Sequence, residues 1–402
     1  MAGVAEKARF YLERAVPQLR EFEEKNIFTP DEIRSLVRKR TDYEHLVLSP
    51  GNKPHDWLSY ANWEKSLEKL RATRCRRLQI RTSSSHAGQG RVFAILERAV
   101  SRHPESLELW KEYLAFAREM KATKRYRKVM TRALRMHPAK SELWVLAGRR
   151  SASSGDMPTA RSFFMRGVRF CTREPTVWLE YTRCEMEWLR HMEARKGKKG
   201  GAERAITEQA EHSDDEIRLG EDDDSEDDVD ENGRMILPDP EKAAKKQVFD
   251  DATAQKLEKK NPALDGAIPQ AIFDISRKQA FFNAAVAEQF FDLFSAFNGV
   301  SSQGRILEHV LMTMQELYPN NPSTLYCHIR QPLIGVDINT PAYPKALREA
   351  LSRLKSALAT TTDKPQLAEK IRSWFEPVLS TNDLDAGIRT VLEHTLRTLP
   401  KP

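Results

Sequence analysis

Three tryptophans, Trp110, Trp144 and Trp178, follow one another at intervals of 34 residues. That interval is the period of helix-turn-helix repeats that stack into solenoids. Two kinds of dipeptide recur at the same interval. An arginine followed by a small residue occurs at Arg98-Ala99, Arg132-Ala133 and Arg166-Gly167, and a His-Pro pair occurs at His103-Pro104 and His137-Pro138. Because several landmarks share one period, the sequence predicts an all-α helical-repeat solenoid.

Each repeat is predicted to pair two helices, since the proline after the Arg-Ala helix ends that helix and precedes the one that carries tryptophan. Aromatic residues follow the tryptophans at helical spacing, which places them on one helix face. Such a stripe is more often a core than a ligand cage, so we expect these residues to build the repeats. The predicted structural set is Trp57, Tyr60, Trp63, Arg98, Trp110, Tyr113, Arg132, Trp144, Arg166, Trp178 and Tyr181.

The chain of 402 residues is predicted to have four parts. They are an N-terminal helical region (1–55), the repeats (56–194), a basic and then acidic linker (195–239) and a helical C-terminal region that holds possible degenerate repeats (240–402). The linker contains the acidic run 214–231, which cannot bury enough apolar area to fold, so we expect it to be flexible. Ser213 and Ser225 precede acidic residues and are candidate phosphorylation sites.

Helical patterns return after the acidic run and are punctuated by proline and glycine. They cover 241–260, 268–297, 305–317, 343–358, 365–379 and 384–399.

The formal net charge is +7, and much of the acid lies in the linker, so the folded parts are more basic than the total indicates. Clusters of cations could contact RNA phosphates without any base-reading motif, although a charged outer helix face is the plainer interpretation. The candidate RNA or partner contacts are Arg38, Lys39, Arg40, Arg71, Arg74, Arg76 and Arg77, and a further basic cluster lies between Arg118 and Lys128.

The sequence carries none of the short motifs of phosphate-binding loops, nucleophile elbows, zinc proteases or kinases. We therefore expect that the protein is not an enzyme and that it binds no cofactor and no small-molecule substrate. The four cysteines form no Cys-x-x-Cys pair, which argues against a zinc site or a disulfide framework. Charges at helical intervals from Glu6 to Arg14 leave no room for a signal peptide, and no apolar run is long enough to span a membrane. An intracellular protein is therefore expected.

Two sets of residues resemble known families. The series Trp57-x-x-Tyr60-x-x-Trp63-Glu64, repeated from Trp110 and from Trp178, resembles the half-a-TPR repeats of RNA-processing factors. The segments 27–33 (Ile-Phe-Thr-Pro-Asp-Glu-Ile), 37–44 (Val-Arg-Lys-Arg-Thr-Asp-Tyr-Glu) and 267–273 (Ala-Ile-Pro-Gln-Ala-Ile-Phe) are similar to the U3 small nucleolar RNA-associated protein 6 family.

This resemblance implies a scaffold in the UtpB subcomplex of the small-subunit processome, with tandem β-propeller proteins as partners and a role in early pre-18S rRNA processing in the nucleolus. Association with the U3 small nucleolar ribonucleoprotein (snoRNP) and pre-rRNA is implied, whereas direct RNA contact is left open. The alternatives are a half-a-TPR scaffold in mRNA splicing or 3′-end processing, and a direct RNA-binding protein.

Overall fold

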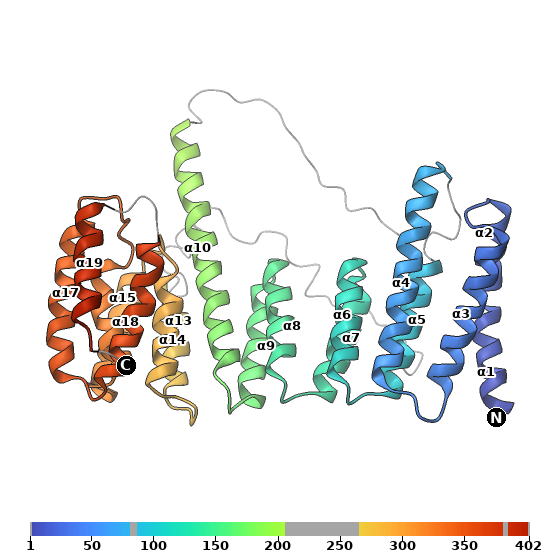
Figure 1. Ribbon diagram of the computed structural model, residues 1–402, viewed down its shortest axis with the longest axis horizontal. Helices are drawn as coiled ribbons and strands as arrows, with labels where there is room; N and C mark the ends of the chain where they lie inside the picture. Colours follow the sequence, from blue (N-terminus) through green and yellow to red (C-terminus); the bar gives the residue numbers. More distant parts are fainter. Residues whose placement is uncertain (1, 81–86, 206–264, 381–384, 401–402) are drawn as a thin grey trace, which may run out of the picture. The chain divides into compact units, whose positions relative to one another are not determined.

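The computed structural model describes residues 2–80, 87–205, 265–380 and 385–400, and every regular element within them is helical (Figure 1). The prediction of an all-α repeat protein is confirmed. The chain divides into two compact units, residues 1–171 and 172–402. Among the described residues, no helix combines the length and apolar content that crossing a bilayer requires.

The first unit contains nine of the described helices. They are α1 (Ala2–Glu13), α2 (Val16–Glu24), α3 (Pro30–Leu48), α4 (Pro54–Arg77), α5 (Ala87–Arg102), α6 (Leu107–Glu119), α7 (Thr123–Met136), α8 (Ser141–Ser153) and α9 (Met157–Phe170). From α4 onward they pack as antiparallel pairs, α4 with α5, α6 with α7 and α8 with α9 (Figure 1).

Local sequence sets several helix boundaries. Thr29 accepts a hydrogen bond from the backbone of Glu32, the Glu32 side chain accepts one from the backbone of Thr29, and Pro30 occupies the first helical position of α3. Asp156 caps α9 through the backbone N–H of Thr159. Gly148 of α8 lies where a Cβ would meet the ring of Phe164, so glycine permits the close approach of α8 and α9.

The second unit begins with α10 (Thr176–Ala205). It continues with α13 (Ala267–Ser276), α14 (Ala284–Ser295), α15 (Gln303–Leu317), α16 (Pro322–Arg330), the short 3-10 helix η2 (Gln331–Leu333), α17 (Tyr343–Thr360), α18 (Lys364–Leu379) and α19 (Ala386–Thr398). Helix α10 packs against α13 and α14.

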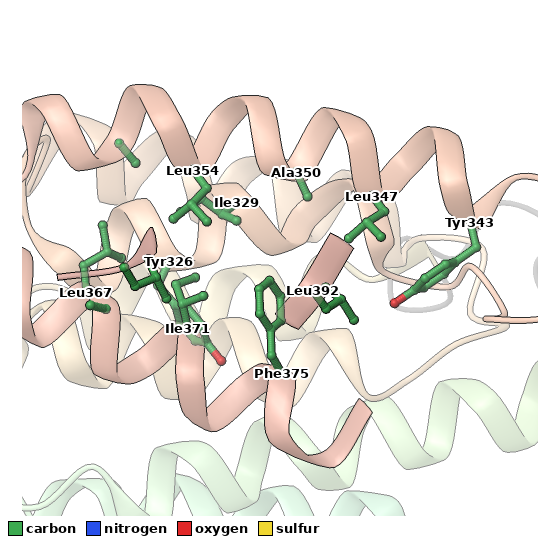
Figure 2. Packing of buried hydrophobic residues seen from close by; sticks show 13 residues of the cluster. Tyr326, Ile329, Tyr343, Leu347, Ala350, Leu354, Leu367, Ile371, Phe375 and Leu392 are labelled. Atoms are coloured by element: carbon green, nitrogen blue, oxygen red, sulfur yellow. The ribbon is translucent and has the colours of Figure 1, made fainter. Parts of the chain in front are cut away.

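An apolar core holds the last four α-helices of this unit together. Leu347 and Leu354 of α17 face Ile371 and Phe375 of α18, with Ile329 of α16 between them (Figure 2). Each of these side chains is almost completely buried, so the core buries the apolar faces that the 3.6-residue pattern of each helix creates.

The boundaries differ from the predicted ones in two places. The predicted end of the repeats, 194, lies within α10, which continues into the predicted linker as far as Ala205, and the two units divide at 171, inside the predicted repeat region. The rest of the predicted linker, with its acidic run, Ser213 and Ser225, lies outside the described residues, as does the helical pattern at 241–260.

The capping interactions of Glu32 predict a pH dependence of stability. Arg74 and the backbone of Thr29 lower the pKa of the Glu32 carboxyl from 4.5 to about 2. Because the pKa is lowered in the folded state, Glu32 contributes stability that is complete above pH 4.5 and is lost as the pH falls toward 2. We expect Glu32→Gln to lower the urea midpoint at pH 6 and to match the wild type near pH 2. A difference that persists at pH 2 would contradict this origin.

Candidate interaction surface

The tryptophans of successive repeats are fixed by one shared hydrogen-bond arrangement. The indole Nε1 of Trp110 donates to the carbonyl oxygen of Pro104 at 2.9 Å, and Nε1 of Trp144 donates to Pro138 at 2.8 Å. His137 Nε2 lies 2.9 Å from the same Pro104 oxygen and is therefore its second donor. Each of these carbonyls thus joins the tryptophan of its own repeat to a side chain of the next.

The position of His137 recurs with the same period. His103, 34 residues earlier, places Nε2 2.6 Å from Oδ1 of Asn52, the oxygen that also accepts from Trp57 Nε1. Cys171, 34 residues later, places Sγ 3.8 Å from the Pro138 oxygen, a weak donor contact. His103, His137 and Cys171 thus link consecutive repeats through hydrogen-bond donors in their side chains, which is a structural role.

A second recurring arrangement of side chains surrounds Trp57 and Trp110. Tyr60 donates its hydroxyl hydrogen to Glu44 at 2.9 Å, Arg98 bridges to the same carboxylate, and the Arg98 guanidinium lies 5.2 Å from the Trp57 ring centre. In the next repeat Tyr113 donates to Glu97, which pairs with Arg132, and Arg132 covers the ring of Trp110. The predicted structural residues therefore act as linked sets of tyrosine, glutamate, arginine and tryptophan.

The arrangement ends at the third repeat because two of its members change together. Ala147 stands three residues after Trp144, where a tyrosine would be expected, and Thr131 stands where Glu97 lies one repeat earlier. Arg166, equivalent to Arg132, is exposed. Trp178 is buried near Phe281 within the second unit, and its Nε1 has no hydrogen-bond partner among the described residues.

Three of the predicted contact residues pair with carboxylates of the same unit, and two of them, Arg40 and Arg71, are buried, whereas Arg74 is half-buried. Arg40 is 2% exposed and donates to Glu64 at 2.7 Å. Arg71 is buried and pairs with Glu68, and Arg74 forms two 2.7 Å hydrogen bonds with Glu32 and lies over the Phe28 ring. Their charge was visible in the sequence, but their carboxylate partners were not.

The other four, Arg38, Lys39, Arg76 and Arg77, are exposed on α3 and the end of α4. They remain candidates for contact with RNA or a partner.

Two guanidinium groups share the Glu64 carboxylate in the core of the first repeat. Arg91 Nε lies 3.0 Å from the same Glu64 oxygen that Arg40 contacts. Burial and the neighbouring Arg40 lower the pKa of Arg91, and burial together with Glu44 raises the pKa of Tyr60. The cluster is a buried charge network whose members depend on one another.

A cavity of about 740 Å³ opens between α1, α3, α4 and α5. Its walls combine aromatic residues with cations: Phe10, Tyr11 and Trp57 with Lys7, Arg98 and Arg102. Phe10 is 53% exposed, and the Arg98 guanidinium lies 3.8 Å from the Tyr11 ring centre. This site could not be predicted from the sequence because its walls come from segments far apart in the chain.

No group of three or more His, Cys, Asp or Glu in the described residues could hold a metal ion. The four cysteines are buried and free, and burial raises the pKa of the Cys327 thiol. What the described surface offers is apolar and aromatic contact area with cations beside it, which suits the binding of another macromolecule.

Comparison with known proteins gives two family matches to consecutive parts of the chain. The model described as U3 small nucleolar RNA-associated protein 6 matches residues 12–95. The model described as pre-mRNA-splicing factor Syf1/CNRKL1 N-terminal HAT repeat matches residues 94–199. The second match covers the helices that carry the 34-residue period and identifies them as HAT (half-a-TPR) repeats.

Similar proteins carry the name of the first family. The chain is 35% identical over 196 residues to the U3 small nucleolar RNA-associated protein 6 of Schizosaccharomyces pombe, covering 48% of this chain and 40% of that protein. It is 28% identical over 191 residues to the Homo sapiens homologue, covering 46% of this chain and 31% of the homologue. The matched regions thus span less than half the length of these relatives.

Proposed function

We propose that the protein is a non-catalytic scaffold of the U3 snoRNP, because residues 12–95 match the U3 small nucleolar RNA-associated protein 6 model and the chain is 35% identical over 196 residues to the Schizosaccharomyces pombe protein of that name. In this role it supports early pre-18S rRNA processing within the small-subunit processome and works in the nucleolus. The match over residues 12–95 carries the proposal, since that segment precedes the HAT repeats that other RNA-processing factors also contain.

The packing of the repeats supports a scaffold. The aromatic residues of the repeats are mostly buried and hydrogen-bonded to their neighbours, so they serve the fold and leave the surface to partners. Stacked helical repeats characteristically present extended surfaces that bind peptides or helices. We therefore propose protein partners of the tandem β-propeller type, as in a UtpB subcomplex.

The cavity beside α1 is the part of the first unit best suited to a partner peptide. An apolar side chain of the peptide would pack against Phe10 and Tyr11, and an acidic one would meet Lys7 or Arg102. Exposed aromatic residues next to cations are typical of interface hot spots. The exposure of Phe10 in the free chain supports this proposal.

Phe10→Ala should weaken capture of the propeller partners by at least about tenfold, in line with the loss of one aromatic anchor. The test is co-purification from cells with the tagged full chain, together with measurement of unprocessed pre-18S rRNA. Val391→Ala is the matched control, since Val391 is an exposed apolar residue of the second unit. Equal recovery of partners with Phe10→Ala would remove the cavity from the proposal.

A splicing scaffold is the second candidate, because the splicing-factor repeat model matches residues 94–199. The two candidates differ in the RNA that accompanies the protein, which is U3 snoRNA in one case and spliceosomal RNA in the other.

A further inference from the structure

Helices α7 and α9 carry cations and no acidic residue. Six of the fourteen residues of α7 are lysine or arginine, and α9 adds three arginines. Residues 118–170 hold fourteen cations and three acids, a net charge of +11 that exceeds the +7 of the whole chain. Helices α7 and α9 supply nine of these fourteen cations, so the positive charge is concentrated on the second helices of these two repeats.

Six of these cations have no ion-pair partner among the described residues and are exposed. They are Lys124, Arg127, Lys128 and Arg135 of α7 with Arg166 and Arg169 of α9, defined here as the basic face. Arg166 differs in this respect from its equivalents in the two preceding repeats, because Arg98 pairs with Glu44 and Arg132 pairs with Glu97. The charge of the basic face is thus available to a ligand.

The repeat period aligns the cations of the two helices. Arg135 and Arg169 are 34 residues apart, as are Arg132 and Arg166. Equivalent residues of stacked repeats occupy equivalent places on their helices. Along α7, Lys124, Lys128 and Arg135 recur at helical spacing, so neighbouring charges are separated by about 6 Å or more along the axis. An extended polyanion fits such a series better than a single small anion.

An exposed aromatic ring lies at the end of α9. Phe170 is 56% exposed, directly follows Arg169 and stacks in parallel on Trp144, with ring centres 5.6 Å apart and planes 9° apart. Met136, one repeat earlier, is 51% exposed, and Met165 is 50% exposed. An apolar platform beside unpaired cations is the combination on which unstacked bases bind while the phosphates meet the charges.

We propose that the basic face and Phe170 bind single-stranded RNA, with the cations holding the phosphates and Phe170 stacking on a base. The contact is independent of base sequence, because phosphates and ring faces are common to every nucleotide. This proposal goes beyond the scaffold function and does not depend on it, since any single-stranded RNA of sufficient length presents the same chemistry.

The experiment measures binding of a fluorescent oligouridine RNA to the full chain by anisotropy over a range of salt concentrations. The variant Lys128→Glu/Arg135→Glu/Arg169→Glu should lower the slope of log affinity against log salt by about 2, since each phosphate contact in a single strand contributes about 0.7. Phe170→Leu keeps the apolar packing on Trp144 but removes the aromatic face. It should weaken binding by about tenfold with an unchanged slope.

The matched control is Lys345→Glu/Arg348→Glu/Lys355→Glu, which reverses three exposed cations of α17 in the second unit. It should retain at least half of the slope and most of the affinity. Equal losses in both triple variants would overturn the proposal in favour of diffuse attraction. Polyglutamate that competes as well as RNA, with no effect of Phe170→Leu, would show that the basic face binds acidic protein instead.

The triple variant of the basic face should still co-purify with the propeller partners. Failure of this inference is therefore distinguishable from failure of the scaffold function, which is tested by the partners and not by RNA affinity. Unchanged RNA affinity in both the triple variant and Phe170→Leu would exclude the basic face as the RNA site.

Discussion

Trp110→Ala is expected to destabilise the first unit by about 3–5 kcal/mol. Trp110 is 2% exposed, its Nε1 donates to the Pro104 oxygen, and its ring carries the Arg132 guanidinium. The substitution leaves a cavity between repeats and removes one of the two donors to Pro104, so the link to His137 is weakened as well. Urea unfolding followed by circular dichroism measures the change in the free energy of unfolding.

Two further variants separate the causes. Trp110→Phe keeps most of the ring volume but removes the Nε1 donor, so it should cost less than Trp110→Ala. Met136→Ala changes a residue that is 51% exposed and should stay within about 0.5 kcal/mol of the wild type. A cost below about 1 kcal/mol for Trp110→Ala would contradict the role given to the repeat tryptophans.

Glu64→Gln is expected to cost about 3–5 kcal/mol, because it leaves two buried guanidinium groups without their shared carboxylate. The side chains of Arg40 and Glu64 are each 2% exposed, and Arg91 is 13% exposed. Desolvation of such charges is offset only while the carboxylate is present. Thermal and urea unfolding of the variant provide the measurement.

The matched control is Glu119→Gln, which removes the carboxylate of the exposed pair between Lys69 and Glu119 at 3.9 Å. That change should cost between 0 and about 1 kcal/mol. Adding Arg40→Met to Glu64→Gln should restore part of the lost stability, since one uncompensated charge then disappears. Equal effects of Glu64→Gln and Glu119→Gln would show that burial of the network does not determine its energetic role.

The repeat architecture could be predicted from the sequence because it depends on a period. The tryptophans keep the 34-residue spacing through three repeats, and Pro104 and Pro138 precede two of them at equivalent positions, so a few positions determine the fold class. The three tryptophans are 2–6% exposed in the structure. The hydrogen bonds of Trp110 and Trp144 to Pro104 and Pro138 follow from the same register, with donor and acceptor six residues apart.

Other features could not be predicted because they depend on long-range contacts. Arg40 has the same appearance in the sequence as the exposed Arg38, and only the packing of α4 on α3 brings Glu64 to it. Helix α16 is absent from the predicted helices; Asn321 caps it, and Pro322 occupies its first turn. The pattern at 268–297 is two helices, because Asn283 caps a second one.

The basic face could be predicted from the sequence only in part. The cluster from Arg118 to Lys128 was visible as charge, but the absence of acidic partners and the exposure of Phe170 required the structure. Arg166 was assigned to the repeat framework, and it differs from Arg98 and Arg132 because Thr131 replaces the glutamate that would pair with it.

Purification of the tagged full chain from cells, with and without RNase, tests the scaffold account most directly when proteins are identified by mass spectrometry and RNA by sequencing. The account predicts U3 snoRNA and pre-18S rRNA in the untreated sample, and propeller proteins that remain bound after RNase treatment. Spliceosomal RNA with splicing proteins in place of these, or complete release of the protein partners by RNase, would contradict it.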